Sequence, residues 1–253
     1  MATTALSRIT RYCDRLLRTA AFADYDQAVN GLQVENDGRV RRLAAAVDAG
    51  LPTVRLAAEA GADLLLVHHG LFWTKRQPWV GPTRRLLGLL VQHNLAVYSA
   101  HLPLDAHPRL GNNARLCAAL GLRPARPFFQ CKGRAIGWEA RARIPRRELV
   151  ARLERVLNGP VRVIPAGPAT CRRIGIVTGG AGEDLRQVAE AGLDTFVTGE
   201  GPHWTFALAE EWGVNVLYGG HYATEVLGVK ALTAHLARRF RLPWVFLDHP
   251  SGL

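Results

Sequence analysis

Two adjacent histidines stand at the end of a short apolar run. Residues 64–67 are apolar and are followed by His68, His69 and Gly70. A run of this length predicts a buried strand, and parallel sheets carry their functional groups where such strands end. Neutral imidazoles bind divalent metal ions, so the pair indicates a metal site. The alternative is one buried and one surface histidine, because neighbouring strand residues point to opposite faces unless the backbone turns, which Gly70 would permit.

A second donor group follows the next apolar run. Residues 96–99 lead to His101, and the carboxylate of Asp105 comes soon after. Pro103 argues against a helix, so both side chains are expected on a loop. Asp105 is a candidate metal ligand, with a turn or helix-capping role as its alternative. His101 is a candidate catalytic residue that would transfer a proton.

The third donor group lies closer to the carboxyl end. His221 and Glu225 follow Gly219 and Gly220, and their spacing places both side chains on one face of the first turn of a helix. The alternative is an exposed histidine beside a carboxylate that the helix dipole favours. Three donor groups at predicted strand ends or helix starts favour a metal site over three unrelated roles.

These side chains supply more ligands than one catalytic zinc ion uses. A catalytic Zn²⁺ usually has three protein ligands, whereas two ions about 3.5 to 4 Å apart need a larger set. Glu225 is the natural bridge between two ions and is also a candidate catalytic residue. Mixed nitrogen and oxygen donors suit Zn, Mn, Fe, Co or Ni. The residues predicted to bind two divalent metal ions per subunit are His68, His69, Asp105, His221 and Glu225.

An α/β fold with two intimate α/β subdomains is predicted to position these donors. Apolar runs at 43–47, 64–67 and 96–99 alternate with helical segments, which predicts a largely parallel sheet in the metal-binding subdomain. Two prolines then break the pattern near residue 125. The metal-binding subdomain is therefore predicted at 1–125 plus 214–253, and the second subdomain at 126–213. Asp48, at another strand end, is predicted to orient a ligand histidine, and Glu200 and His203 are further candidates for proton transfer.

Composition restricts the surroundings of the protein. The formal charge is +11, but the arginines are scattered along the chain, which favours a solvated surface over a nucleic-acid face. No stretch reaches the roughly 20 apolar residues of a membrane span, and the polar start after Met1 does not resemble a signal segment. The 4 cysteines form no C-x-x-C pair. A cytoplasmic protein without membrane contact is therefore predicted.

Several segments together resemble one known family, the Nif-three-like dinuclear metal-centre proteins, often labelled GTP cyclohydrolase 1 type 2 homologs. The resemblance covers nearly the whole chain. It implies the Nif-three-like fold, the same five metal ligands, and a ring-shaped homohexamer whose metal sites face an internal cavity. The segments that carry it are Asn30 to Val34, Asp63 to Trp73, Tyr98 to Asp105, Gly111 to Asn113, Thr198 to Glu200 and Gly219 to Gly228.

The leading functional hypothesis is a dinuclear-metal-dependent hydrolase. The ions carry more positive charge than two carboxylates neutralise, so an anionic small-molecule substrate is expected. The family label indicates hydrolysis of a nucleotide of the GTP cyclohydrolase kind, and a phosphoesterase would use the same metals. A different hypothesis is a metal-binding hexameric ring that serves as a protein- or nucleic-acid-binding module.

Overall fold

The computed structural model describes residues 3–73 and 78–253, in which helices and strands form two α/β units. Unit 1 consists of Met1–Leu104 and Val229–His249, and unit 2 of Asp105–Gly228 and Pro250–Leu253. The predicted α/β fold class is confirmed.

The sheet of unit 1 is built on the three apolar runs of the first half of the chain. They form β4 (Leu43–Asp48), β5 (Leu64–His69) and β6 (Ala96–Ser99), which pair in parallel. β13 (Trp244–Phe246) adds a parallel strand beside β4, and β2 (Gly31–Val34) adds an antiparallel strand beside β6. The predicted largely parallel sheet is therefore present, and the carboxyl ends of β4, β5 and β6 share one edge.

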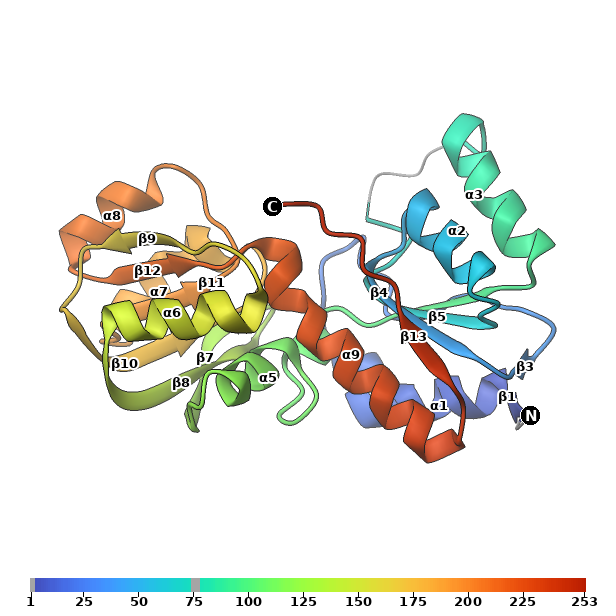
Figure 1. The fold of residues 1–253 in the computed structure, drawn as a ribbon, viewed down its shortest axis with the longest axis horizontal. Coiled ribbons are helices and arrows are strands. Elements are labelled where there is room, and N and C mark those ends of the chain that lie inside the picture. Colours follow the sequence, from blue (N-terminus) through green and yellow to red (C-terminus); the bar gives the residue numbers. More distant parts are fainter. Residues whose placement is uncertain (1–2, 74–77) are drawn as a thin grey trace. The chain divides into compact units, whose positions relative to one another are not determined.

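Helices cover both faces of this sheet (Figure 1). α2 (Leu51–Glu59) and α3 (Gly81–Gln92) pack on one face, where Val54 and Leu90 join its apolar core. α1 (Leu6–Leu17) lies on the other face. Pro52 is the second residue of α2, in the first turn, where no backbone N–H is needed. Further elements among the described residues of unit 1 are β1 (Thr4–Ala5), η1 (Thr19–Ala21), β3 (Arg39–Val40), most of α4 (Leu102–Asp105) and the part of α9 (His221–Phe240) from Val229 onward.

In the described residues of unit 2, the sheet has parallel strands at its centre and antiparallel strands outside them. In spatial order the strands are β7 (Pro124–Cys131), β8 (Arg134–Pro145), β10 (Thr170–Ile176), β11 (Thr195–Thr198), β12 (Asn215–Tyr218) and β9 (Arg162–Pro165). β10, β11 and β12 pair in parallel, and β8 and β9 flank them in the antiparallel sense. β7 pairs with β8 and forms an edge.

Helices also pack on both faces of the second sheet (Figure 1). α5 (Asn112–Ala119) and α6 (Arg146–Leu157) bury Leu116 and Leu149 against one face. The other helices of unit 2 are η2 (Ala181–Asp184), α7 (Leu185–Glu190) and α8 (Thr205–Trp212), together with the part of α9 up to Gly228. Within the described ranges, no helix combines the length and apolar character that crossing a membrane requires.

The structure corrects two predictions about organisation. The predicted boundaries, 1–125 plus 214–253 and 126–213, differ from those of the compact units, because β12 pairs with β11 and β9 in the second sheet. The predicted loop around Pro103 is a single helical turn, α4 (Leu102–Asp105). Proline is tolerated there because the first residues of a helix have no intrahelical acceptor for their N–H groups.

Candidate metal centre

His68 and His69, hereafter the β5 histidines, end strand β5. The strand continues through both residues, so the predicted departure from strand geometry at the pair does not occur. Their ring centroids nevertheless lie 4.8 Å apart. The strand ends before Gly70, where a Cβ would fall 2.2 Å from the Gln33 side chain, so a larger residue would have to displace that side chain.

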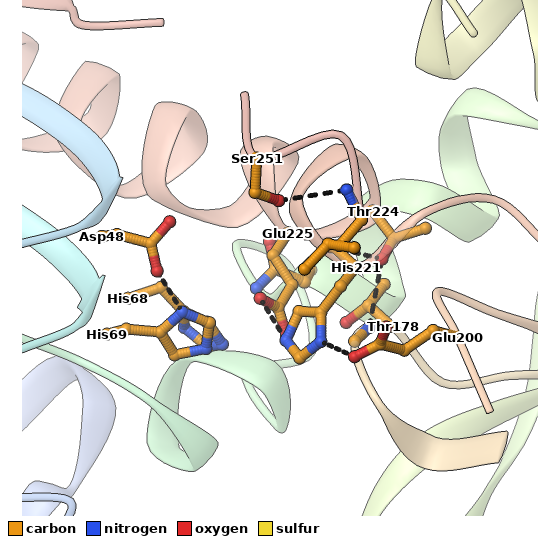
Figure 2. A network of polar contacts seen from close by, with 12 residues as sticks. Asp48, His68, His69, Thr178, Glu200, His221, Thr224, Glu225 and Ser251 are labelled. Atoms are coloured by element: carbon orange, nitrogen blue, oxygen red, sulfur yellow. Dashed lines mark hydrogen bonds and ion pairs between the residues drawn. The ribbon is translucent and has the colours of Figure 1, made fainter. Parts of the chain in front are cut away.

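Both β5 histidines are held through the same ring nitrogen. Nδ1 of the fully buried His68 lies 2.9 Å from the carbonyl oxygen of Ala100. Nδ1 of His69 lies 2.8 Å from Oδ1 of Asp48, as Figure 2 shows. A carbonyl and a carboxylate oxygen accept hydrogen bonds, so Nδ1 donates in each case and Nε2 carries the lone pair that a metal ion would use. The predicted contact of Asp48 with one of the candidate ligand histidines is present.

His101 joins these residues at the carboxyl edge of the sheet. Its ring centroid lies 4.8 Å from that of His68 and 5.6 Å from that of His69. Each of the three rings offers a nitrogen, and these nitrogens lie within 4.8 Å of one another. Unit 1 therefore contains a histidine group that could hold a metal ion, as expected for consecutive strand ends of a parallel sheet.

In unit 2, Asp105 is oriented by an asparagine. Nδ2 of the buried Asn112 donates a 2.8 Å hydrogen bond to Oδ1 of Asp105, which is 5% exposed. Oδ1 of Asn112 accepts the backbone N–H of Gly228 at 2.6 Å. A Cβ at Gly228 would lie 2.4 Å from that oxygen, so this position of α9 has no room for a side chain. These contacts fix the direction in which Asp105 presents its carboxylate.

His221 and Glu225 lie in the first turns of α9, on one face as predicted. Nε2 of His221 is 3.2 Å from Oε2 of Glu225, and Nδ1 is 2.8 Å from Oε1 of Glu200 (Figure 2). Burial lowers the pKa of the His221 imidazole, but its two carboxylate partners outweigh this effect and raise the pKa to about 9. Positive charge at this place, whether a proton or a metal ion, is therefore stabilised. Glu200 reaches this histidine, whereas the side chain of His203 is exposed.

The loop after β10 closes around the Glu225 carboxylate. Gly179 has a φ of +71°, and a Cβ there would lie 2.2 Å from Oε1 of Glu225. Its backbone N–H donates to Oγ1 of Thr224 at 3.0 Å. A Cβ at Gly199, in the loop after β11, would lie 2.8 Å from Cα of His221. The carboxyl ends of parallel strands in unit 2 thus meet the start of α9 at close range, through glycines.

The predicted metal ligands, together with the candidate catalytic residue His101, form two preorganised sets, one in each unit. Unit 1 contributes the β5 histidines and His101, and unit 2 contributes Asp105, His221 and Glu225. Their chemistry fits divalent ions of the Zn or Mn type, because two imidazole rings already have Nδ1 bound and the carboxylates are buried. Sequence reasoning missed two buried polar partners of these donors, Asp24 beside His101 and Asn112 beside Asp105. For Asn112 the sequence offered one indication, because this residue lies in a segment that carries the family resemblance, Gly111 to Asn113. That indication did not reveal its contact with Asp105.

Comparisons with known proteins point to one family. A family model described as "Duf34/NIF3 (NGG1p interacting factor 3)" matches residues 4–251. A protein from Deinococcus radiodurans named "GTP cyclohydrolase 1 type 2 homolog" is 40% identical over 249 residues, covering 97% of this chain and 93% of its own. A protein of the same name from Halobacterium salinarum is 42% identical over 252 residues, covering 96% of this chain and 97% of its own. The crystal structure of TTHA1606 from Thermus thermophilus has 42% sequence identity and a TM-score of 0.90, and the match covers 99% of this chain and 100% of that one.

Proposed function

Because the chain belongs to the Duf34/NIF3 family, we propose that it is a hydrolase that depends on a dinuclear metal centre. Two divalent ions per subunit are proposed, drawn from Zn, Mn, Fe, Co and Ni. Their proposed ligands are His68, His69, Asp105, His221 and Glu225.

One observation carries the proposal. In both β5 histidines, Nδ1 is bound to an oxygen acceptor, 2.9 Å away for His68 and 2.8 Å away for His69. This is the arrangement by which metalloproteins fix the tautomer and direction of a ligand imidazole. Two histidines that served only for packing would have no need to share the same tautomer at one strand end. The hydrogen bond from Asn112 to Asp105 and the contact of His221 Nδ1 with Glu200 support the proposal in the same way.

The residues have separate roles in the proposed reaction. When bound, the ions would activate water and polarise the bond under attack. Glu225, which is only 3% exposed, would hold the ions through its two carboxylate oxygens. His101 would accept the proton that the attacking water loses. Asp48 and Asn112 would keep ligands in place from the protein side.

A nucleotide is the proposed substrate. The curated relatives are named "GTP cyclohydrolase 1 type 2 homolog", which supports a ring-opening hydrolysis of that kind. The positive charge of a dinuclear site would attract a phosphate-bearing molecule. Phosphoesters belong in the same substrate screen, since they would meet the same metals.

The second candidate function is a binding module. The family description, NGG1p interacting factor 3, refers to interaction with a protein and favours this alternative. In it the chain forms a homohexameric, metal-bearing ring that binds a protein or a nucleic acid. Cytoplasmic location and hexameric assembly belong to both proposals, and light scattering of the purified protein tests the assembly.

Metal content tests the site. Elemental analysis of the purified protein should give close to two ions per subunit, with less in His68→Ala and in Glu225→Gln. His93→Ala, an exposed histidine just after α3, is the matched control and should keep the full content. Absence of metal from the wild type, even after reconstitution, would remove the basis for a hydrolase.

Turnover and DNA binding separate the two functions. Glu225→Gln should lose hydrolysis of the best nucleotide or phosphoester while the assembly stays intact, and undiminished turnover would refute the proposed role of the metals. A gel shift with single-stranded and duplex DNA at increasing salt tests the other candidate, because phosphate-driven binding weakens steeply as salt rises. No shift at low salt would eliminate its nucleic-acid form.

A further inference from the structure

Asp24 is a carboxylate that no motif or spacing in the sequence singles out, yet its side chain lies beside His101. It lies between η1 and β2, and 4% of its side chain is exposed. Its Oδ1 is 2.8 Å from Nδ1 of His101. A buried carboxylate is unfavourable unless its oxygens accept hydrogen bonds, so its donors determine what it does.

Both oxygens of Asp24 accept further hydrogen bonds. Oδ1 accepts the backbone N–H of Tyr25 at 2.8 Å, and Oδ2 accepts Nδ2 of Asn30 at 2.7 Å and the backbone N–H of Leu102 at 3.1 Å. Oδ1 of Asn30 in turn accepts the backbone N–H of His101 at 2.7 Å. Burial raises the pKa of Asp24, but these partners and the His101 ring outweigh it and lower the pKa below its usual value. The carboxylate is therefore ionised at neutral pH and acts only as an acceptor.

An acceptor-only partner decides which nitrogen of His101 carries the proton. Nδ1 must donate to Asp24, so in the neutral ring Nε2 has the lone pair. We infer that Asp24 is a positioning residue: it holds His101 in the Nδ1-protonated tautomer, in which Nε2 can accept a proton beside the β5 histidines. The catalytic consequence rests on the proposed hydrolase function, whereas the tautomer rests on the hydrogen bonds of unit 1 alone.

The substitution Asp24→Asn tests this role because asparagine has nearly the same shape. If the amide nitrogen replaces Oδ2, it faces two donors, the N–H of Leu102 and the amide of Asn30. If it replaces Oδ1, it faces one donor, the N–H of Tyr25, and the ring of His101. The second orientation opposes fewer donors. In it Nδ1 of His101 becomes the acceptor, and the ring proton moves to Nε2.

Ring ¹⁵N NMR reports the tautomer directly. The full chain is labelled at histidine, freed of metal by chelation and kept at mildly alkaline pH, and His101→Gln identifies the His101 signals by their loss. We expect a protonated Nδ1 and an unprotonated Nε2 in the wild type, and the reverse in Asp24→Asn. The exposed Asp26 provides the matched control, since Asp26→Asn alters a neighbouring carboxylate and should leave the pattern unchanged. A doubly protonated or Nε2-protonated ring in the wild type would overturn the inference, as would an unchanged tautomer in Asp24→Asn.

Metal content and kinetics test the catalytic consequence. Because His101 is not among the proposed ligands, Asp24→Asn should keep the wild-type metal content while kcat falls by about 10²- to 10⁴-fold and KM changes little. A reversed tautomer with undiminished kcat would overturn the positioning role. Failure of the wild type to hydrolyse any substrate would overturn the proposed function, and the spectra would still decide the tautomer. Should Asp24→Asn not fold, the wild-type spectrum decides it alone.

Discussion

Gly179 gives a direct test of how closely the protein encloses Glu225. A Cβ at this position would lie 2.2 Å from Oε1 of Glu225 and 3.3 Å from Nε2 of His221. Non-bonded heavy atoms pack best at about 3.5 Å or more, so Gly179→Ala must displace the carboxylate by roughly 1 Å. The atom displaced belongs to a flexible side chain, so the substitution should move the proposed ligand and leave the fold in place.

Two separate costs follow from this substitution. The φ of +71° is left-handed, which costs an alanine about 1 to 2 kcal/mol. Displacement of Glu225 should weaken metal binding by at least the roughly 10- to 100-fold that loss of an outer partner causes. Gly133→Ala separates the two, because Gly133 has a φ of +79° and its Cβ would meet nothing within 4 Å.

Unfolding by urea and calorimetric titration with Zn²⁺ or Mn²⁺ measure these effects. Both variants should lose a similar free energy of unfolding when free of metal, and only Gly179→Ala should lose metal affinity. Wild-type metal affinity in Gly179→Ala would show that Glu225 is not held as described or is not a ligand. Equal loss of affinity in Gly133→Ala would assign the effect to general destabilisation.

Other substitutions test the surroundings of the site and the core of unit 2. Asp48→Asn should lower metal affinity about 10-fold, as measured in competition with a chelator. This is the lower end of the roughly 10- to 100-fold range for loss of an outer partner, because the Asp48 side chain is 49% exposed. Unchanged affinity would contradict the role of its contact with His69. Glu139 has no exposed side-chain surface and pairs with Arg126 and Arg173. Glu139→Gln should lower the free energy of unfolding by about 2 to 3 kcal/mol. This is below the usual cost of breaking a buried pair, because water can reach the arginines once the carboxylate is gone. The control Glu148→Gln, at an exposed position, should lower the free energy of unfolding by less than about 1 kcal/mol. Burial raises the pKa of Glu139, but hydrogen bonds from Arg173 and Arg126 lower it below 4.5 overall, so its stabilisation is complete above that value and is lost as pH falls through the folded-state pKa. The difference in unfolding free energy between wild type and Glu139→Gln should therefore be constant from pH 7 to about 5 and should shrink as the pH falls further. A difference that is the same at about pH 3 as at pH 7 would contradict the lowered pKa.

Sequence periodicity predicted the strands more successfully than it predicted which strands pair with one another. β4, β5 and β6 follow directly from apolar runs, because strands buried on both faces need continuous apolar sequence. β7 was not predicted, because Pro124 and Pro127 suggest a break between elements. An edge strand tolerates prolines, because on its open side no backbone N–H is needed for a hydrogen bond to a neighbouring strand. The sheet to which β12 belongs was also missed. Val216 and Leu217 would be buried in either sheet, and nothing in so short a run specifies which strands will flank it.

The donors of the candidate site were predictable, but the groups that aim them were not. The β5 histidines and His221 with Glu225 stand out by type and spacing, since a strand end and a helix turn impose short, fixed separations. The acceptor of His68 is a backbone carbonyl at Ala100, and every residue has one, so its identity carries no signal. Asp24 lies 77 positions before His101 and is indistinguishable in the sequence from a solvated turn residue. Orientation of a ligand or a base depends on such long-range hydrogen bonds. For that reason the tautomer of His101, and not the list of donors, is where the structure adds most to the chemistry.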